Sequence, residues 1–184
     1  MRPALRQDGM IMRIMGLKVA TAIQFRSLTL MKSSVFAATL AGIALVATGA
    51  MAQDYSASPT SGQVRLSEGF PNDPYTVELI AGGNIDASRL GGACVGSIAS
   101  APDFRLTYQT NGNLPLTIVA ISDGDTTLVI NGPDGRWHCD DDSGGDLNPG
   151  VLFQSPQSGV YDIWVGSIGQ PVAAVLGITE QAGW

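Results

Sequence analysis

The chain has 184 residues, a formal net charge of −6, 45% hydrophobic residues, two cysteines and one histidine. Six of the ten basic residues lie before Gln53, so residues 53–184 keep four Arg, no Lys and fifteen Asp or Glu, a net charge of −11. Such an acidic chain without a basic stripe excludes nucleic-acid binding and favours cationic ligands.

The amino-terminal segment has the pattern of an export signal. Lys32 is followed by an uncharged run rich in Ala and Gly, which ends in Ala-Met-Ala at residues 50–52. This order is typical of a signal peptide. The sequence therefore predicts a signal peptide at 31–52, a mature chain that starts at Gln53 with no membrane span, and a periplasmic or secreted location. An uncleaved membrane anchor is the alternative. We expect residues 1–30 to be an extended leader or a misassigned start.

The mature chain predicts one small β domain at 63–184, preceded by a polar lead-in at 53–62. Phe104, Leu106 and Tyr108 alternate with polar residues, as in a half-buried strand. We interpret Asp103 and Arg105 as a solvated end of this strand. Similar alternation or short apolar runs predict further strands, separated by turns rich in Gly, Asn and Asp, at 64–66, 75–79, 116–121, 126–130, 151–154, 161–165 and 173–179. The sequence thus predicts an all-β, antiparallel, jelly-roll-like sandwich of about eight strands. Residues 85–99 have no clear period and predict a short helix or a loop.

Both cysteines belong to the mature chain. In an oxidising compartment Cys94 and Cys139 are expected to form one disulfide, which would contribute about 3–4 kcal/mol in the chain-entropy model. Two free thiols or a metal pair is the alternative, but the chain has no CxxC spacing.

An acidic segment at 136–149 carries most of the candidate chemistry. Asp and Asn oxygens in Gly-containing turns are what calcium prefers, and adjacent carboxylates repel each other unless a cation offsets their charge. The sequence predicts a calcium site made by Asp140, Asp142 and Asp146 with help from Asp123, Asp125 or Asp134. Val151 stands where an EF-hand has its bidentate Glu, so a true EF-hand is excluded. An exposed turn without an ion is the alternative.

The same segment resembles two motifs of chymotrypsin-like serine peptidases. Asp142-Ser143-Gly144-Gly145 is similar to the motif around their nucleophile, and His138-Cys139 is similar to their histidine motif. A triad needs the imidazole against the serine hydroxyl. The chain's only His stands five residues before Ser143, whereas that family takes the two motifs from different barrels. A peptidase that uses Ser143 and His138 is therefore the alternative to a non-catalytic protein.

Residues 114–178 resemble the bacterial pre-peptidase C-terminal domain family. The resemblance rests on Asp125-Thr126-Thr127-Leu128, Pro133-Asp134-Gly135, the Asp-rich turn at 140–142, and Ser158-Gly159-Val160-Tyr161 followed by Val165-Gly166. It implies a secreted β-sandwich with an accessory role, such as binding a protein or a cell-surface polymer, and bound calcium in some relatives. These domains usually follow a peptidase, and no catalytic domain precedes this one.

Aromatic residues near the acidic turn suggest a third function. Trp137, Tyr161 and Trp164 could stack on sugar rings, as in carbohydrate-binding modules. Tyr161 and Trp164 lie on opposite faces of one strand, so we expect at least one to be buried, and Trp137 is the candidate ligand surface.

Overall fold

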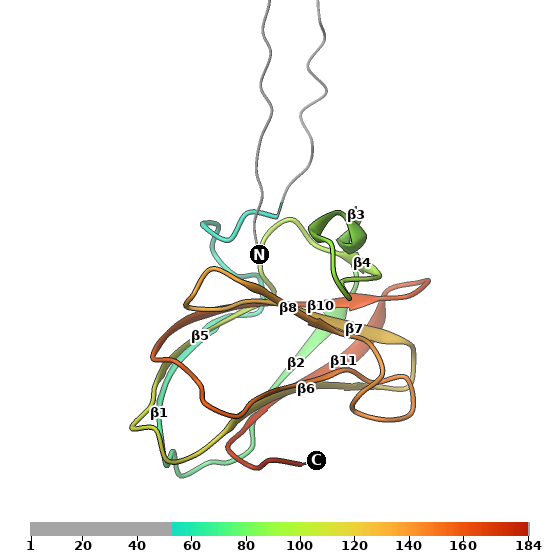
Figure 1. Ribbon diagram of the computed structural model, residues 1–184. Helices are drawn as coiled ribbons and strands as arrows, with labels where there is room; N and C mark the ends of the chain where they lie inside the picture. Colours follow the sequence, from blue (N-terminus) through green and yellow to red (C-terminus); the bar gives the residue numbers. More distant parts are fainter. Residues whose placement is uncertain (1–52, 184) are drawn as a thin grey trace, which may run out of the picture. The chain divides into compact units, whose positions relative to one another are not determined.

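The computed structural model describes residues 53–183, so the predicted leader and cleavage site lie outside the described residues. Two β-sheets, here sheet A and sheet B, pack face to face in two layers (Figure 1). This confirms the predicted all-β sandwich. Among residues 53–183 no helix is long and apolar enough to cross a membrane.

Sheet B has four strands and lies in the lower layer of Figure 1. Its order is β2 (Tyr75–Ala81), β11 (Val172–Thr179), β6 (Leu116–Ser122) and β9 (Gly150–Phe153), and all neighbours are antiparallel. β2 and β9 are therefore its edges. All four strands were predicted within a few residues of their observed bounds.

Sheet A has seven strands and centres on β10, which is long enough to pair with three partners. β5 and β4 pair with β10 along one of its sides, and β7 pairs with it along the other. Each of these three strands has one further neighbour: β1 pairs with β5, β3 with β4 and β8 with β7. The strands are β1 (Gln63–Ser67), β3 (Ile85–Asp86), β4 (Ser97–Ile98), β5 (Phe104–Gln109), β7 (Thr126–Asn131), β8 (Trp137–Asp140) and β10 (Gly159–Ser167).

One detail of the predicted topology is wrong, because β1 pairs with β5 in parallel. No hairpin joins these two strands. After β1 the chain crosses to sheet B, forms β2 and returns through β3 and β4, and a parallel pair needs such a long connection. Every other pair in the sandwich is antiparallel.

The main core fills the space between the sheets, and the alternation seen in the sequence explains it. Phe104, Leu106 and Tyr108 are 2%, 0% and 1% exposed and point inward from β5. Inward residues of β7, β10, β6 and β11 complete the cluster, including Leu128, Ile130, Ile163, Leu116, Ile118 and Leu176. Burial of each such side chain contributes about 1.5–3 kcal/mol.

A second, smaller core lies on the outer side of sheet A. Trp164 of β10 and Val129 of β7 are fully buried there under Ile85, Ile98 and Cys94. Because both of its faces are covered, β7 is apolar on both sides, as its sequence indicated.

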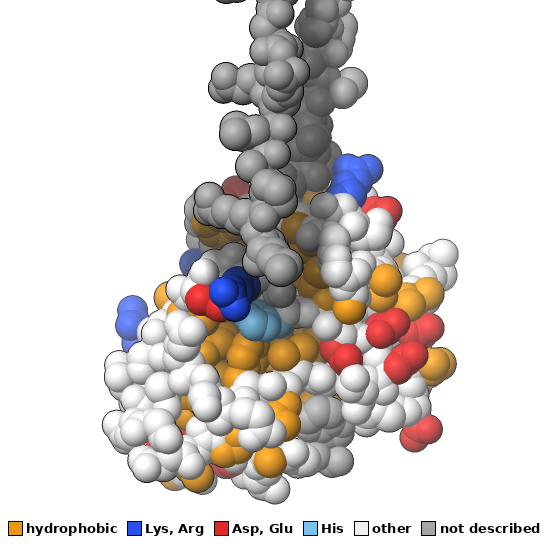
Figure 2. All heavy atoms as spheres, viewed as in Figure 1, with side chains coloured by type: hydrophobic (Ala, Val, Ile, Leu, Met, Phe, Trp, Pro, Cys, Tyr) orange, Lys and Arg blue, Asp and Glu red, His pale blue; other side chains and the backbone are white. Residues whose placement is uncertain are grey.

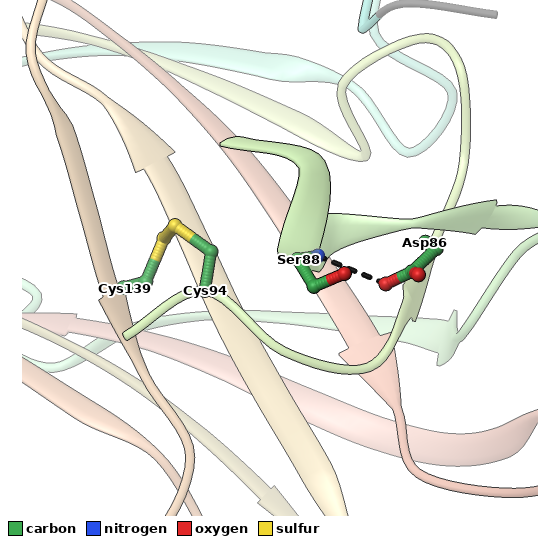
Figure 3. Close-up of a disulfide and its surroundings, with 4 residues drawn as sticks. All are labelled: Asp86, Ser88, Cys94 and Cys139. Carbon is green, nitrogen blue, oxygen red and sulfur yellow. Dashed lines mark hydrogen bonds between the residues drawn. A yellow bond between two sulfur atoms is a disulfide. The ribbon is translucent and has the colours of Figure 1, made fainter. Parts of the chain in front are cut away.

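Residues 85–98 form the cover over this second core. The segment contains β3, the 3₁₀ helix η1 (Ala87–Leu90) and β4, so the prediction of a short helix or a loop is confirmed. The Asp86 carboxylate caps η1 by accepting from Ser88 N at 2.9 Å. The predicted Cys94–Cys139 disulfide is also confirmed, and it ties this cover to β8 (Figure 3).

The predicted solvated end of β5 is wrong. Asp103 is 5% exposed, accepts from Val165 N at 2.8 Å, and burial raises its pKa from 3.8 to about 6. Arg105 forms an ion pair with Asp162 at 2.6 Å. Its guanidinium also donates to the carbonyls of Tyr55 and Ala57 at 2.6 and 3.1 Å, so it fastens the lead-in to sheet A.

Candidate functional site

The predicted calcium ligands fall into two places. The β6–β7 turn and the β8–β9 loop lie against each other, since Thr126 N donates to Leu147 O at 3.2 Å and Ser122 N to Asn148 Oδ1 at 2.8 Å. These loops and the end of β8 that leads into the second of them carry five of the six predicted carboxylates, namely Asp123, Asp125, Asp140, Asp142 and Asp146. Figure 2 shows acidic side chains gathered at the right, over this end of the sandwich.

The sixth residue, Asp134, is not brought to them. Asp134 lies in the β7–β8 turn, next to the pair of Asn131 and Trp137. Asp140 pairs with Leu128 at the opposite end of the same hairpin, so the length of the hairpin separates the two carboxylates. The Arg136 backbone N–H, with the charges of His138 and Arg136, lowers the pKa of Asp134.

Asp140 is engaged in hydrogen bonds within its own loop. Its Oδ2 accepts from Ser143 N at 2.9 Å and from Gly150 N at 2.8 Å, and its Oδ1 accepts from Ser143 Oγ at 2.6 Å. The carboxylate therefore sets the start and the end of the β8–β9 loop.

Asp142 faces other carboxylates. Partial desolvation raises the pKa of this exposed carboxyl, and the negative charges of Asp141, Asp125 and Asp140 raise it further. Asp125 also has a buried Oδ1 without a hydrogen-bond partner. Even so, no three His, Cys, Asp or Glu side chains of residues 53–183 are placed to hold a metal ion. The loops thus do not form a ready calcium site as they stand, and calcium binding stays a prediction.

The candidate peptidase residues are not assembled. Ser143 Oγ donates to Asp140, whereas His138 Nε2 lies 3.8 Å from Asp134 Oδ1. The His138 ring packs edge-to-face on Phe153 at 4.9 Å, beside a hollow of about 140 Å³. In this arrangement no imidazole lies against the serine hydroxyl within the described part of the chain, so the geometry does not support a triad.

The aromatic residues are largely structural. Tyr161 and Trp164 are 1% and 0% exposed, and the Tyr161 hydroxyl donates to Gln157 O at 2.8 Å. Trp137 is half-buried, with its ring 5.5 Å from that of Trp164. Only part of the Trp137 ring is therefore free for a sugar.

The outer face of sheet B carries the most unusual surface of the described residues. Ile80 of β2, Ile121 of β6 and Val175 of β11 are 64%, 55% and 36% exposed. The strand register brings them together. Val175 pairs with Ile121 on one side and with Glu78 on the other, and Ile80 follows Glu78 by two residues on the same face of β2. We call the outward side of β2, β11 and β6 the sheet B face.

Three hollows open on the sheet B face, and Ile121 lines all of them. Their volumes are about 640, 220 and 160 Å³. Gly177 lines the second hollow, and a Cβ there would lie 3.0 Å from Val119 Cγ2, so the missing side chain lets Val119 pack closely against β11. Large aliphatic side chains around a hollow are typical of a surface that binds another molecule.

Charge is unevenly distributed between the two sheets. Glu78 and Asp123 line the largest hollow and Asp146 lines the smallest, and none of the three is lined by Arg. The four Arg of the described residues lie on β1, η1, β5 and the β7–β8 turn, all of which belong to the sheet A side. Figure 2 likewise shows basic side chains over the upper layer.

Sequence reasoning missed the sheet B face, although a signal was present. β6 and β11 are apolar on both of their sides, a pattern that indicates a strand covered on both faces. β7 has the same pattern and is covered. Part of the outward side of β6 and β11 is covered as well, since Thr117, Val119 and Thr179 are buried and Thr117 Oγ1 donates to Gln181 O at 2.6 Å. Ile121 and Val175 lie beyond this cover and are exposed among residues 53–183.

Comparisons with known proteins identify no family for this chain. No protein-family model and no curated protein matches it. Among solved structures it is similar to PliG of Aeromonas hydrophila, a periplasmic inhibitor of g-type lysozyme, at 14% sequence identity. The match covers 65% of this chain and 98% of that chain with a TM-score of 0.35, which is too low to support an argument about this protein.

Proposed function

We propose that the mature chain is an exported, non-catalytic binding module that recognises a protein or a cell-surface polymer through the sheet B face. The observation that carries the proposal is the exposed group of Ile80, Ile121 and Val175 around a hollow of about 640 Å³. An exposed apolar patch with a polar rim marks an interaction site, because covering it removes apolar surface from water.

Two further features support an exported accessory role. The disulfide between Cys94 and Cys139 belongs in an oxidising compartment, in agreement with the predicted signal peptide. The motifs that resemble pre-peptidase C-terminal domains lie on β7, the β7–β8 turn, the Asp-rich turn after β8, and β10, and this resemblance implies a secreted accessory role.

Calcium at the acidic loops is a second proposal, favoured by one observation. Asp125 has a buried carboxylate oxygen without a hydrogen-bond partner, and Asp142 is close enough for their charges to interact. A calcium ion would offset this repulsion and fix the loop beside the sheet B face. It would add stability to the module and leave the ligand surface on sheet B.

The remaining alternatives have less support in the geometry. Peptidase activity needs His138 and Ser143 to meet, and they bind different carboxylates. Sugar binding at Trp137 has only part of one ring available. Glycan-array binding by the wild type that is lost in Trp137→Ala would favour the sugar-binding alternative.

Site-specific photo-crosslinking tests the proposed function. A photo-reactive benzoylphenylalanine replaces Ile121 in one variant and Val160 in the other, and each chain is produced with its own leader in the native cells. Val160 is 41% exposed but lies on β10 of sheet A, so it is a matched aliphatic control. We expect adducts from position 121 and few from position 160. Equal yields from both positions would contradict the proposal.

A further inference from the structure

We propose that the partner of the sheet B face is a basic protein, which places an aliphatic surface on Ile121 and its neighbours and Lys or Arg side chains against the acidic rim. This inference rests on the proposed function and names the partner's chemistry. It follows from three observations: the apolar centre of the face, the negative charge of its rim, and the net charge of the whole mature chain.

The apolar centre calls for a partner with a complementary apolar surface. Ile80, Ile121 and Val175 lie on three adjacent strands and surround the largest hollow. The middle strand of the three is flanked on both sides, so a partner can reach these side chains only from above the sheet. An aliphatic centre of this kind provides affinity through burial of apolar area, and it favours a partner of complementary shape without favouring either sign of charge.

The rim selects the charge of the partner. Glu78 stands beside Val175 within the largest hollow, Asp123 closes the same hollow at the β6–β7 turn, and Asp146 borders the small hollow on the other side of Ile121. No Arg or Lys lines any of these hollows. An acidic or neutral partner would leave these carboxylates partly desolvated and without counter-charges, which costs free energy.

The charge of the whole chain acts in the same direction. Residues 53–184 carry a net charge of −11, and their four Arg lie on the side of sheet A. Sheet B therefore presents the more negative side to an approaching molecule. A field of this sign accelerates encounter with basic proteins and slows encounter with acidic ones, most strongly at low ionic strength.

A second copy of this chain does not fit the same face. A two-fold pairing of two sheet B faces would bring Glu78 and the acidic rim of one copy against those of the other. Like charges across an interface cost free energy, and each mature chain carries −11. The geometry thus favours an unlike, positively charged partner over self-association.

The test extends the crosslinking at position 121 by identifying the adducts with mass spectrometry. We expect the main partner to be a protein with an isoelectric point above about 9, and its yield to fall about ten-fold between about 0.05 and 0.5 M salt. Glu78→Gln combined with Asp123→Asn should lower the yield about five-fold. Asp134→Asn removes one charge in the β7–β8 turn and should leave the yield unchanged.

The outcomes separate the two proposals. Adducts from position 121 that are glycans, acidic proteins or a second copy of this chain would overturn the inference and leave the proposed function in place. A basic partner whose yield ignores both salt and the Glu78→Gln/Asp123→Asn change would also overturn it. Equal adduct yields from positions 121 and 160 would overturn both. The fold of each variant is checked by its thermal transition, and all of the substituted side chains lie at or near the surface.

Discussion

The buried carboxyl of Asp103 predicts an unusual dependence of stability on pH. Asp103 is 5% exposed, and burial raises its pKa from 3.8 to about 6, although Val165 N and Thr60 Oγ1 donate to it. Because the folded pKa is the higher one, the folded state binds the proton more tightly than the unfolded state. The contribution of Asp103 to stability is therefore fully present below about pH 3.8 and is lost as the pH rises through about 6.

The size of this effect follows from the shift. A change of about two pKa units at about 1.36 kcal/mol each gives a loss of about 3 kcal/mol between pH 4 and pH 7.5. In Asp103→Asn the side chain cannot ionise, and its amide oxygen can still accept from Val165 N. We therefore expect the stability of Asp103→Asn relative to the wild type to rise by about 3 kcal/mol over this range.

Urea unfolding of both proteins at several pH values, with fluorescence of the buried Trp as the signal, measures this difference. Subtracting the wild-type free energy of unfolding from that of the variant cancels the contributions of the other titrating groups. One of these groups is Glu68, whose pKa is lowered to about 2 by donors such as the Asn111 backbone N–H and the Thr110 hydroxyl. A difference that stays constant from pH 4 to pH 7.5 would refute the reasoning. It would mean that Asp103 titrates alike in the folded and unfolded chain.

Three further predictions concern the disulfide, the acidic loops and Ser143. The Cys94→Ala/Cys139→Ala variant should lose about 4 kcal/mol of unfolding free energy in chemical denaturation, because the bridge closes a long loop; a loss below about 1 kcal/mol would contradict this. Calcium at millimolar levels should raise the melting temperature of the wild type but not of Asp140→Asn/Asp142→Asn, and an unchanged wild-type value would end the calcium proposal. A fluorophosphonate should label neither the wild type nor Ser143→Ala, because no imidazole activates the hydroxyl; labelling of the wild type alone would revive the peptidase alternative.

Much of the sandwich could be predicted from the sequence because its strands are half-buried. In β5 the apolar residues Phe104, Leu106 and Tyr108 alternate with outward ones, and a period of two has one simple explanation. Turns rich in Gly and Asn separate most of the strands, so the approximate bounds of eight strands follow from local pattern, whereas the short strands β3, β4 and β8 were not predicted. The disulfide followed from the cysteine count and the predicted compartment.

Other elements depend on contacts between distant residues and could not be predicted. β8 has the sequence Trp-His-Cys-Asp, without clear alternation, and is a strand because it pairs with β7. Asp103 and Arg105 are polar residues that a local pattern places in solvent. Their partners Val165 and Asp162 lie about 60 residues further along the chain, in β10.

The grouping of the acidic residues was predicted from the sequence, whereas the sheet B face was not. Asp123 and Asp125 do lie at the same end of the sandwich as the Asp-rich loop, as their proximity to the acidic segment suggested. The sheet B face was missed, because a strand that is apolar on both sides looks the same whether a further layer or a partner covers it. Only the layer count of the fold shows that Ile121 is exposed.

Retention of the purified mature protein by the cell-envelope fraction of the producing cells tests the central claim most directly. The wild type, Ile80→Thr/Ile121→Thr and the sheet A control Val160→Thr are compared at equal concentration, with their thermal transitions as a check on folding. Threonine keeps the β-branched shape and removes apolar surface from the sheet B face. We expect the double variant to lose at least ten-fold in retention while Val160→Thr binds as the wild type does. Equal retention of all three proteins would contradict binding through the sheet B face.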